Sequence, residues 1–132
     1  MRISILAGIL TLLGCEAHAE WVEVGSSAAY GGYTIYADPL TIRRKDGLAR
    51  MWTLYDYQAL QDQDKSGFLS RRSLQQFDCT DERYRFVYDT LFSGNMTRGD
   101  EVTTIALERE WEPVAPGSVG ESLWRIACSR VR

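Results

Sequence analysis

Histidine is almost absent from this sequence, because His18 near the N-terminus is the only one. The rest of the chain therefore has no imidazole for general-base catalysis, for a Ser or Cys triad, or for a typical zinc site. A glycine-rich phosphate loop and a dinucleotide fingerprint are also lacking. A mechanism based on carboxylates alone is the remaining enzymatic alternative. These absences predict a protein that is not an enzyme and has no catalytic residues, metal site or cofactor.

Long apolar runs are scarce as well. Residues 3–13 form one run of eleven residues, well short of the roughly 20 that a membrane-spanning helix needs. Met1-Arg2 precedes the run, and the small residues Ala17 and Ala19 follow it before Glu20. This pattern is typical of a secretory signal peptide. We therefore predict that residues 1–19 are a signal, that cleavage falls between Ala19 and Glu20, and that residues 20–132 are exported as one domain without a transmembrane segment.

A second cleavage site competes with the first. Leu12-Leu13-Gly14-Cys15 resembles a lipobox, in which Cys15 would become the lipid-modified first residue. We favour the ordinary site, because Leu13 is bulky for its position and a 14-residue signal would be short. Cys15 stays the candidate for lipidation. The choice decides between a free periplasmic protein and one held at the outer-membrane surface.

Positive charge is not in excess. The chain has 15 Lys and Arg against 18 Asp and Glu, for a net charge of −3. A phosphate-binding face needs clustered basic residues, so a nucleic-acid partner is not expected. The short runs at residues 43–45 and 71–72 are interpreted as solvated charges at a turn and at a strand edge.

Cysteine is also rare. Once Cys15 leaves with the signal, Cys79 and Cys128 remain, and an even pair in an oxidising compartment is expected to form a disulfide. Closing a loop of about 50 residues would stabilise the fold by roughly 4 kcal/mol in the chain-entropy model. Two buried free thiols are the alternative.

The mature part shows mainly a two-residue hydrophobic period, which predicts antiparallel strands. Asp46-Gly47 is a tight-turn pair that predicts a hairpin. The expected strands cover residues 21–24, 33–37 (ended by Asp38-Pro39), 48–57, 68–79, 83–92 and 102–107, and residues 41–44 lead into the tight turn. Ala49, Met51, Tyr55 and Tyr57 should share one face of their strand. Phe77 and Cys79 should share a face of the strand at residues 68–79.

The strand at residues 83–92 has the clearest pattern. We expect Tyr84, Phe86, Tyr88 and Phe92 to point towards the core. Arg83, Arg85 and Asp89 should then face solvent.

Residues 61–67 are polar and predict a loop. Within them, Asp62 to Gly67 copies the opening of a calcium loop, with oxygen ligands at alternate positions and glycine at the sixth. The twelfth position is Ser73, where a calcium loop needs a bidentate glutamate. We therefore interpret the segment as a polar hairpin loop without a metal.

The C-terminal end changes to a helical period. Ser118 and Glu121 form a capping-box pattern after Pro116. The apolar positions that follow would form one stripe and comprise Val119, Leu123, Ile126 and Ala127. This stripe should lie on the sheet and bring Cys128 to Cys79.

Five segments, in this order and spacing, resemble the surface-adhesin protein E-like domain of proteobacteria. They are Tyr36-Ala37-Asp38-Pro39-Leu40-Thr41-Ile42, Met51-Trp52-Thr53-Leu54-Tyr55-Asp56-Tyr57, Phe77-Asp78-Cys79, and residues 88–96 and 111–128. The resemblance implies an α+β fold, a single six-stranded antiparallel sheet with a C-terminal helix packed on its concave face and tied by one disulfide. It also implies a homodimer as one assembly.

The namesake of that family is a lipoprotein adhesin that binds host matrix and serum proteins, so the resemblance implies a protein partner, either a host matrix protein or an envelope component. No adhesive motif transfers to particular residues. The expected function is an exported binding module of the cell envelope. The alternative is a free periplasmic structural or stress-related protein with no host ligand.

Overall fold

An antiparallel sheet in simple sequence order forms the body of the protein. The computed structural model describes residues 19–63, 66–106 and 109–129. The main strands are β1 (Val22–Ser27), β2 (Tyr33–Lys45), β3 (Leu48–Gln63), β4 (Ser66–Asp78), β5 (Arg83–Phe92) and β6 (Glu101–Ala106). A two-residue strand, β7 (Glu112–Pro113), pairs with β5. The chain also forms two short 3-10 turns, η1 (Ala29–Gly31) and η2 (Asn95–Thr97), and the helix α1 (Val119–Cys128).

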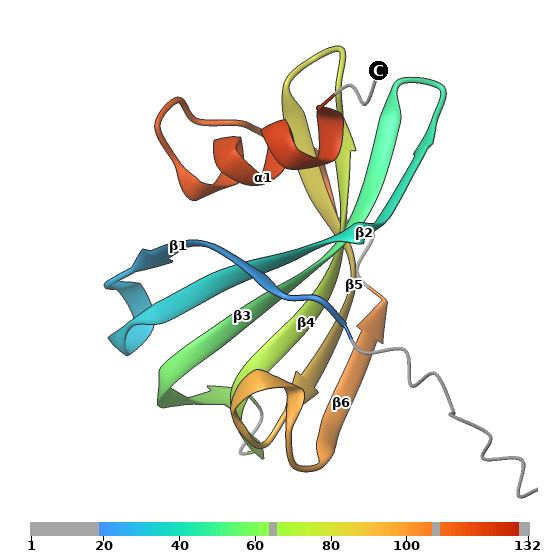
Figure 1. Ribbon diagram of the computed structural model, residues 1–132. Helices are drawn as coiled ribbons and strands as arrows, with labels where there is room; N and C mark the ends of the chain where they lie inside the picture. Colours follow the sequence, from blue (N-terminus) through green and yellow to red (C-terminus); the bar gives the residue numbers. More distant parts are fainter. Residues whose placement is uncertain (1–18, 64–65, 107–108, 130–132) are drawn as a thin grey trace, which may run out of the picture.

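The sheet curls, and α1 lies across its concave face at one end (Figure 1). The predicted fold class is confirmed.

The β2–β3 hairpin turns at the predicted pair. Asp46 and Gly47 both have positive φ, at 53° and 77°, as expected for a two-residue turn whose twist matches that of its strands. This turn sets the register in which Ala49, Met51, Tyr55 and Tyr57 share the helix-facing side of β3, and all four are buried as predicted.

One predicted strand end was wrong. β2 does not end at Asp38-Pro39 but continues through a register shift between Asp38 and Arg43. There the Thr41 hydroxyl accepts the Trp52 amide at 3.0 Å and donates to the Asp38 carbonyl at 2.6 Å. A bulge of this kind tolerates proline, because the lost ladder hydrogen bond falls where the pairing is already interrupted.

The polar stretch at residues 61–67 is not a loop. β3 extends to Gln63 and β4 starts at Ser66, with Gln61 opposite Phe68 and Asp62 opposite Gly67. Residues 64–65, and with them part of the calcium-like segment, lie outside the described residues. Within the described ranges no group of three His, Cys, Asp or Glu side chains could hold a metal ion.

The pattern in β5 was also partly mispredicted. Gln75 lies opposite Phe86, but Leu74 lies opposite Tyr88, so Val87 is an extra residue in the ladder. A bulge shifts the alternation by one residue. Tyr84 and Phe86 therefore pack against the core as predicted, whereas Tyr88 and Phe92 lie on the opposite face and Asp89 turns inward, where it is buried.

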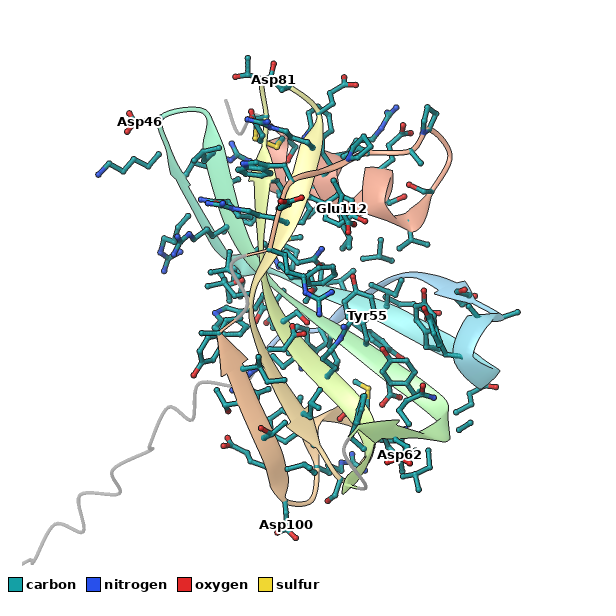
Figure 2. All side chains as sticks on the ribbon, turned by 180° about the vertical axis from the view of Figure 1, so that it is seen from behind. Asp46, Tyr55, Asp62, Asp81, Asp100 and Glu112 are labelled. Atoms are coloured by element: carbon teal, nitrogen blue, oxygen red, sulfur yellow. A yellow bond between two sulfur atoms is a disulfide. The ribbon has the colours of Figure 1, made fainter. Side chains whose placement is uncertain are left out.

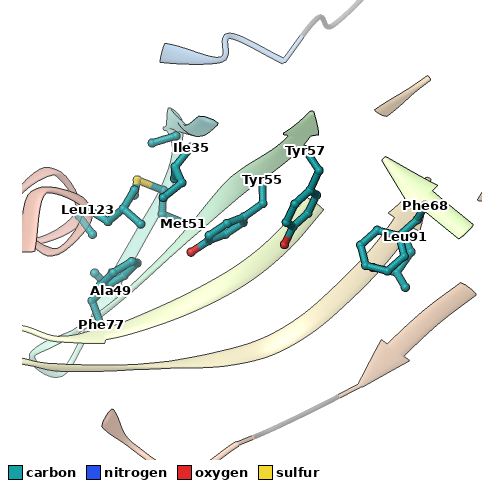
Figure 3. Packing of buried hydrophobic residues seen from close by; sticks show 11 residues of the cluster. Ile35, Ala49, Met51, Tyr55, Tyr57, Phe68, Phe77, Leu91 and Leu123 are labelled. Atoms are coloured by element: carbon teal, nitrogen blue, oxygen red, sulfur yellow. The ribbon is translucent and has the colours of Figure 1, made fainter. Parts of the chain in front are cut away.

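The helix-side core joins α1 to the sheet (Figure 3). Leu123 and Ala127 are buried, and Val119, Ile126 and Trp124 pack beside them, which confirms the predicted stripe. The buried apolar set is completed by Ile35, Ala37, Ala49, Met51, Tyr55, Tyr57, Phe68, Phe77 and Leu91.

The disulfide ties the helix to the sheet. Cys79 follows β4 and is bonded to Cys128 at the end of α1, with the two Cα atoms 5.5 Å apart. The Trp124 indole donates to the Asp78 carbonyl at 2.8 Å beside it. At the other end of α1, Ser118 Oγ accepts the Glu121 amide at 3.1 Å, which is half of the predicted capping box. In the part of the chain that the structure describes, no helix is long and apolar enough to cross a membrane.

Candidate functional site

A hollow of about 360 Å³ lies on the face of the sheet opposite α1. We call it the indole groove. It is lined by Trp21, Asp38, Thr41, Trp52, Arg72 and Thr97, together with Ala19 at its edge. Its walls thus come from the segment before β1, from β2, β3 and β4, and from η2, so only the folded chain brings them together.

Strand register explains how the groove forms. Asp38, Trp52, Leu74 and Tyr88 lie directly opposite one another on β2, β3, β4 and β5. They share the face away from α1, because the neighbouring Met51 is in the helix-side core. The Trp52 and Tyr88 rings meet edge to face, with centroids 6.3 Å apart. This geometry is favourable for aromatic pairs.

Arg72 is held in the groove by aromatic rings. Its guanidinium carbon lies 5.3 Å from the ring centre of Trp52 and 5.4 Å from that of Phe92. Cation–π contacts of this kind keep the group in place. Arg72 Nε is buried and has no hydrogen-bond partner among the described residues. Arg72 is half-buried and lines the hollow, so its planar guanidinium, next to an indole, fits a carboxylate of a partner protein.

Asp38 supplies charge of the opposite sign. It is 5% exposed, and its Oδ1 accepts the Leu40 amide at 3.3 Å. Arg72 and Asp38 line the same hollow. The indole groove can therefore bind an anionic group through Arg72 and a cationic group through Asp38. Tryptophan and arginine are the residue types enriched at the energetic centres of protein interfaces.

A second hollow, the tyrosine pocket, lies on the helix side and has a volume of about 410 Å³. It is lined by Tyr33, Tyr55, Gln75, Tyr84, Ser118 and Leu123, among others. The Tyr55 hydroxyl donates to Gln75 Oε1 at 3.3 Å, and Thr53 donates to the same oxygen at 2.7 Å. Tyr55 stands in the middle of the sheet (Figure 2).

The phenols of Tyr55 and Tyr84 in this pocket stay protonated at neutral pH. Burial raises the pKa of Tyr55 far above its ordinary value. Burial, reinforced by a hydrogen bond with Glu112, raises the pKa of Tyr84 to about 12. A general acid or base works best when its pKa lies near the operating pH. These tyrosines can therefore donate hydrogen bonds but are poorly suited to move protons.

Near Tyr55 lies an ion pair between the half-buried Arg71 and the buried Asp89. Arg71 Nη1 is 3.6 Å from Asp89 Oδ2, and the Arg71 guanidinium lies 4.4 Å from the centre of the Tyr55 ring. Arg71 Nε, Ser73 Oγ and Asp89 Oδ1 are buried and lack hydrogen-bond partners within the described part of the chain. The sequence predicts Arg71 at a solvated strand edge and Asp89 on the solvent-facing side of its strand. Both predictions were wrong, because the Val87 bulge inverts the end of β5 and the register of β4 turns Arg71 inward.

The residues singled out in the sequence do not gather at one place. The disulfide of Cys79 and Cys128 anchors the end of α1 and lines neither the indole groove nor the tyrosine pocket. Ala19 and Glu20, the predicted cleavage residues, are exposed, and Ala19 borders the indole groove. Cys15 lies outside the described residues. Arg72 and Trp52 were not identified as site residues in the sequence, since their partners come from other strands.

A family model described as surface-adhesin protein E matches residues 21–129. The chain belongs to the surface-adhesin protein E family. A crystal form of Haemophilus influenzae protein E is similar in structure, with a TM-score of 0.56 and 12% identity, over 72% of this chain and 80% of that one. Protein E from non-typeable Haemophilus influenzae aligns with a TM-score of 0.54 and 10% identity, over 88% of this chain and 80% of that one. No curated protein matches the sequence. At these identities the likeness to solved structures shows the fold, and the family match supports an adhesin-like module.

Proposed function

We propose that the protein is a non-enzymatic binding module of the cell envelope that takes a protein ligand in its indole groove. The observation that carries the proposal is the groove itself, which is lined by two tryptophans, Trp21 and Trp52, together with Arg72 and Asp38. Membership of an adhesin family supports a binding role. The ligand class is a host matrix protein or a component of the envelope.

The chemistry of the described residues supports a role without catalysis. The mature sequence carries no histidine, and the tyrosines nearest to a pocket have pKa values raised away from neutrality. Asp78 is one of the buried carboxylates. Burial alone would raise its pKa, but hydrogen bonds from the Asp81 amide, Arg83 and the Thr80 amide outweigh burial and lower it. Asp78 is thus held as a structural anion rather than poised to transfer protons.

Export is part of the proposal. Residues 1–19 would act as the signal, with cleavage between Ala19 and Glu20 leaving the domain at residues 20–132, in the periplasm or at the outer-membrane surface. The disulfide is consistent with an oxidising compartment. Lipidation at Cys15 is the competing form and would place the indole groove, which Ala19 borders, within a few residues of the membrane.

The test of binding uses the mature domain with its disulfide intact. Trp52→Ala should weaken binding to the ligand by at least tenfold, measured by surface plasmon resonance against purified matrix and serum glycoproteins and solubilised envelope proteins. Tyr30→Ala removes an aromatic side chain that is 73% exposed and away from the groove, so it should bind like the unmodified protein. Light scattering of the same samples reports whether the domain is a homodimer.

Failure of every partner to bind would reject the proposal in favour of the alternative, a free periplasmic structural or stress-related protein. Cleavage at Ala19 is the feature that favours this alternative. The intact mass of the protein from its own host, before and after reduction and alkylation, separates a chain that starts at Glu20 from an acylated chain that starts at Cys15. A deletion strain with an intact envelope under stress would in turn count against the alternative.

A further inference from the structure

Three arginines line up across the sheet on the face opposite α1. Arg43 on β2 lies directly opposite Arg50 on β3, Arg50 lies opposite Gln76 on β4, and Gln76 lies opposite Arg85 on β5. Residues that pair across strands share a face. The side chains of Arg43, Arg50 and Arg85, which we call the arginine row, therefore stand in one line. Neighbouring strands are about 4.8 Å apart, so the row spans about 14 Å.

The row carries positive charge that the protein does not neutralise. Among the described residues, no ion pair involves Arg43, Arg50 or Arg85. Arg43 donates only to backbone carbonyls, including that of Ile42 at 3.0 Å, and Arg85 donates to the neutral Gln76 at 2.8 Å. Like charges directly opposite each other destabilise a sheet. In a chain with a net charge of −3, such a pair points to an anionic partner.

The surrounding residues hold the row in place. The Trp111 ring lies 4.5 Å from the Arg85 guanidinium carbon and 4.8 Å from that of Arg83. Gln76, which is 5% exposed, accepts the hydrogen bond from Arg85 and so fixes its position. Arg43 and Arg50 line a hollow of about 450 Å³ together with two further cations, Arg44 and Lys45, and one carboxylate, that of Asp46. One end of the row is thus prearranged, and the other opens into a hollow that can admit anionic groups.

Arg43 is separated from its neighbour in the chain. Arg44 turns to the helix side, where its Nε donates to the Ala127 carbonyl at 2.9 Å and its guanidinium also binds the Ser129 carbonyl. Residues 43–45 are all exposed next to the Asp46-Gly47 turn, as the sequence suggested. Within the run, Arg44 is committed to these carbonyls, whereas Arg43 is aligned with arginines that are distant in the sequence.

We propose that the arginine row binds an anionic polysaccharide. Guanidinium groups recognise sulfate, phosphate and carboxylate with paired hydrogen bonds, and a linear polymer presents such groups in a line. A flat anionic membrane fits less well. Asp46 and Asp81 stand at the tips of the β2–β3 and β4–β5 hairpins, whose strands carry the row (Figure 2). These carboxylates would repel a flat anionic surface that extended over both tips.

Single-stranded nucleic acid fits less well too. Its binding relies on aromatic faces on which bases can stack. Trp111, the ring in contact with Arg85 of the row, also lies against the guanidinium group of Arg83 and is therefore already occupied. The row is also separate from the indole groove, because none of its arginines lines that groove. The inference therefore goes beyond the proposed function.

The test uses the mature, disulfide-bonded domain and a heparin dodecasaccharide as the probe, with uncharged dextran as the control ligand. Arg43→Gln/Arg50→Gln/Arg85→Gln should lose at least tenfold in affinity by isothermal titration calorimetry at 50 mM NaCl. The matched triple variant Arg98→Gln/Arg109→Gln/Arg125→Gln removes the same charge from exposed positions elsewhere and should bind within twofold of the unmodified protein. Binding should weaken at 200 mM NaCl, because salt screens exposed charges.

Equal losses in the two triple variants would overturn the proposal, since net charge alone would then explain binding. So would a lack of heparin binding by the unmodified domain, or tighter row-dependent binding of anionic vesicles or of a single-stranded oligonucleotide. Arg50→Gln alone changes one exposed side chain and guards against a folding defect in the triple variant. Trp52→Ala should retain heparin binding. If heparin binding fails while Trp52-dependent protein binding persists, this inference fails alone.

Discussion

The two faces of the sheet use their side chains in opposite ways. On the helix side, Met51 and Phe77 are fully buried and Leu123 is 1% exposed, so the chain covers its own apolar surface. On the other face, Trp52 and Arg50 remain partly or fully exposed. Met51 and Trp52 are neighbours in β3. One strand thus serves both stability and recognition, because successive side chains point to opposite faces.

Removal of the disulfide should show the largest effect on the helix-side face. Cys79→Ser/Cys128→Ser frees the end of α1 and a loop with a sequence separation of 49. The chain-entropy model predicts a loss of about 4 kcal/mol in the free energy of unfolding, which lowers Tm by at least about 10 °C. Differential scanning calorimetry, with and without reductant, measures this loss. An unchanged Tm on reduction would show that the bridge does not hold the helix.

The apolar contact of the helix should come next. Leu123→Ala leaves a cavity where α1 meets the sheet and should cost about 3 kcal/mol, within the usual range for buried leucines. Leu60, which is 66% exposed, is the matched control, and Leu60→Ala should change the free energy of unfolding by less than about 0.5 kcal/mol. Urea denaturation measures both. Equal losses at the two positions would remove the distinction between covered and open surface.

Much of the helix-side face could be predicted from the sequence. The alternation at residues 48–57, the Asp46-Gly47 turn and the stripe around Leu123 are local patterns, and the structure confirms them. The disulfide could be predicted because removal of the predicted signal would leave only one pair of cysteines. These features depend on residues close in the chain or on elimination.

The opposite face could not be predicted in the same way. The arginine row depends on register between four strands, and the place of Tyr88 depends on one extra residue at Val87. Neither leaves a local signal, because a bulge changes side-chain direction without changing composition. Arg72 looked like a solvated charge for the same reason. Its aromatic contacts come from β3 and from the far end of β5.

Acidic pH should remove the stabilising effect of the Asp78 carboxylate. The pKa of this carboxyl is lowered in the folded state, so its stabilising effect is present above the ordinary carboxyl pKa and is lost as the pH falls through the folded-state pKa. Asp78→Asn should lower the free energy of unfolding by about 1–2 kcal/mol at pH 7. This gap between the variant and the unmodified protein should shrink towards pH 3. Urea denaturation at several pH values measures the gap. Asp100→Asn, at an exposed position, should have no comparable effect, and a gap for Asp78→Asn that stays constant with pH would show that the charge is not what matters.

The smallest effect should have the opposite sign. Arg50→Gln removes one of two like charges that face each other across β2 and β3, so the free energy of unfolding should rise by about 0.2–1 kcal/mol. Arg98→Gln, an exposed control without a directly opposed cation in the sheet, should leave it unchanged. Urea denaturation at low ionic strength gives the clearest comparison, because salt screens the repulsion. A loss of stability in Arg50→Gln would mean that Arg50 supports the fold. A gain, combined with weaker heparin binding, would mean that this face gives up stability in order to present charge to a partner.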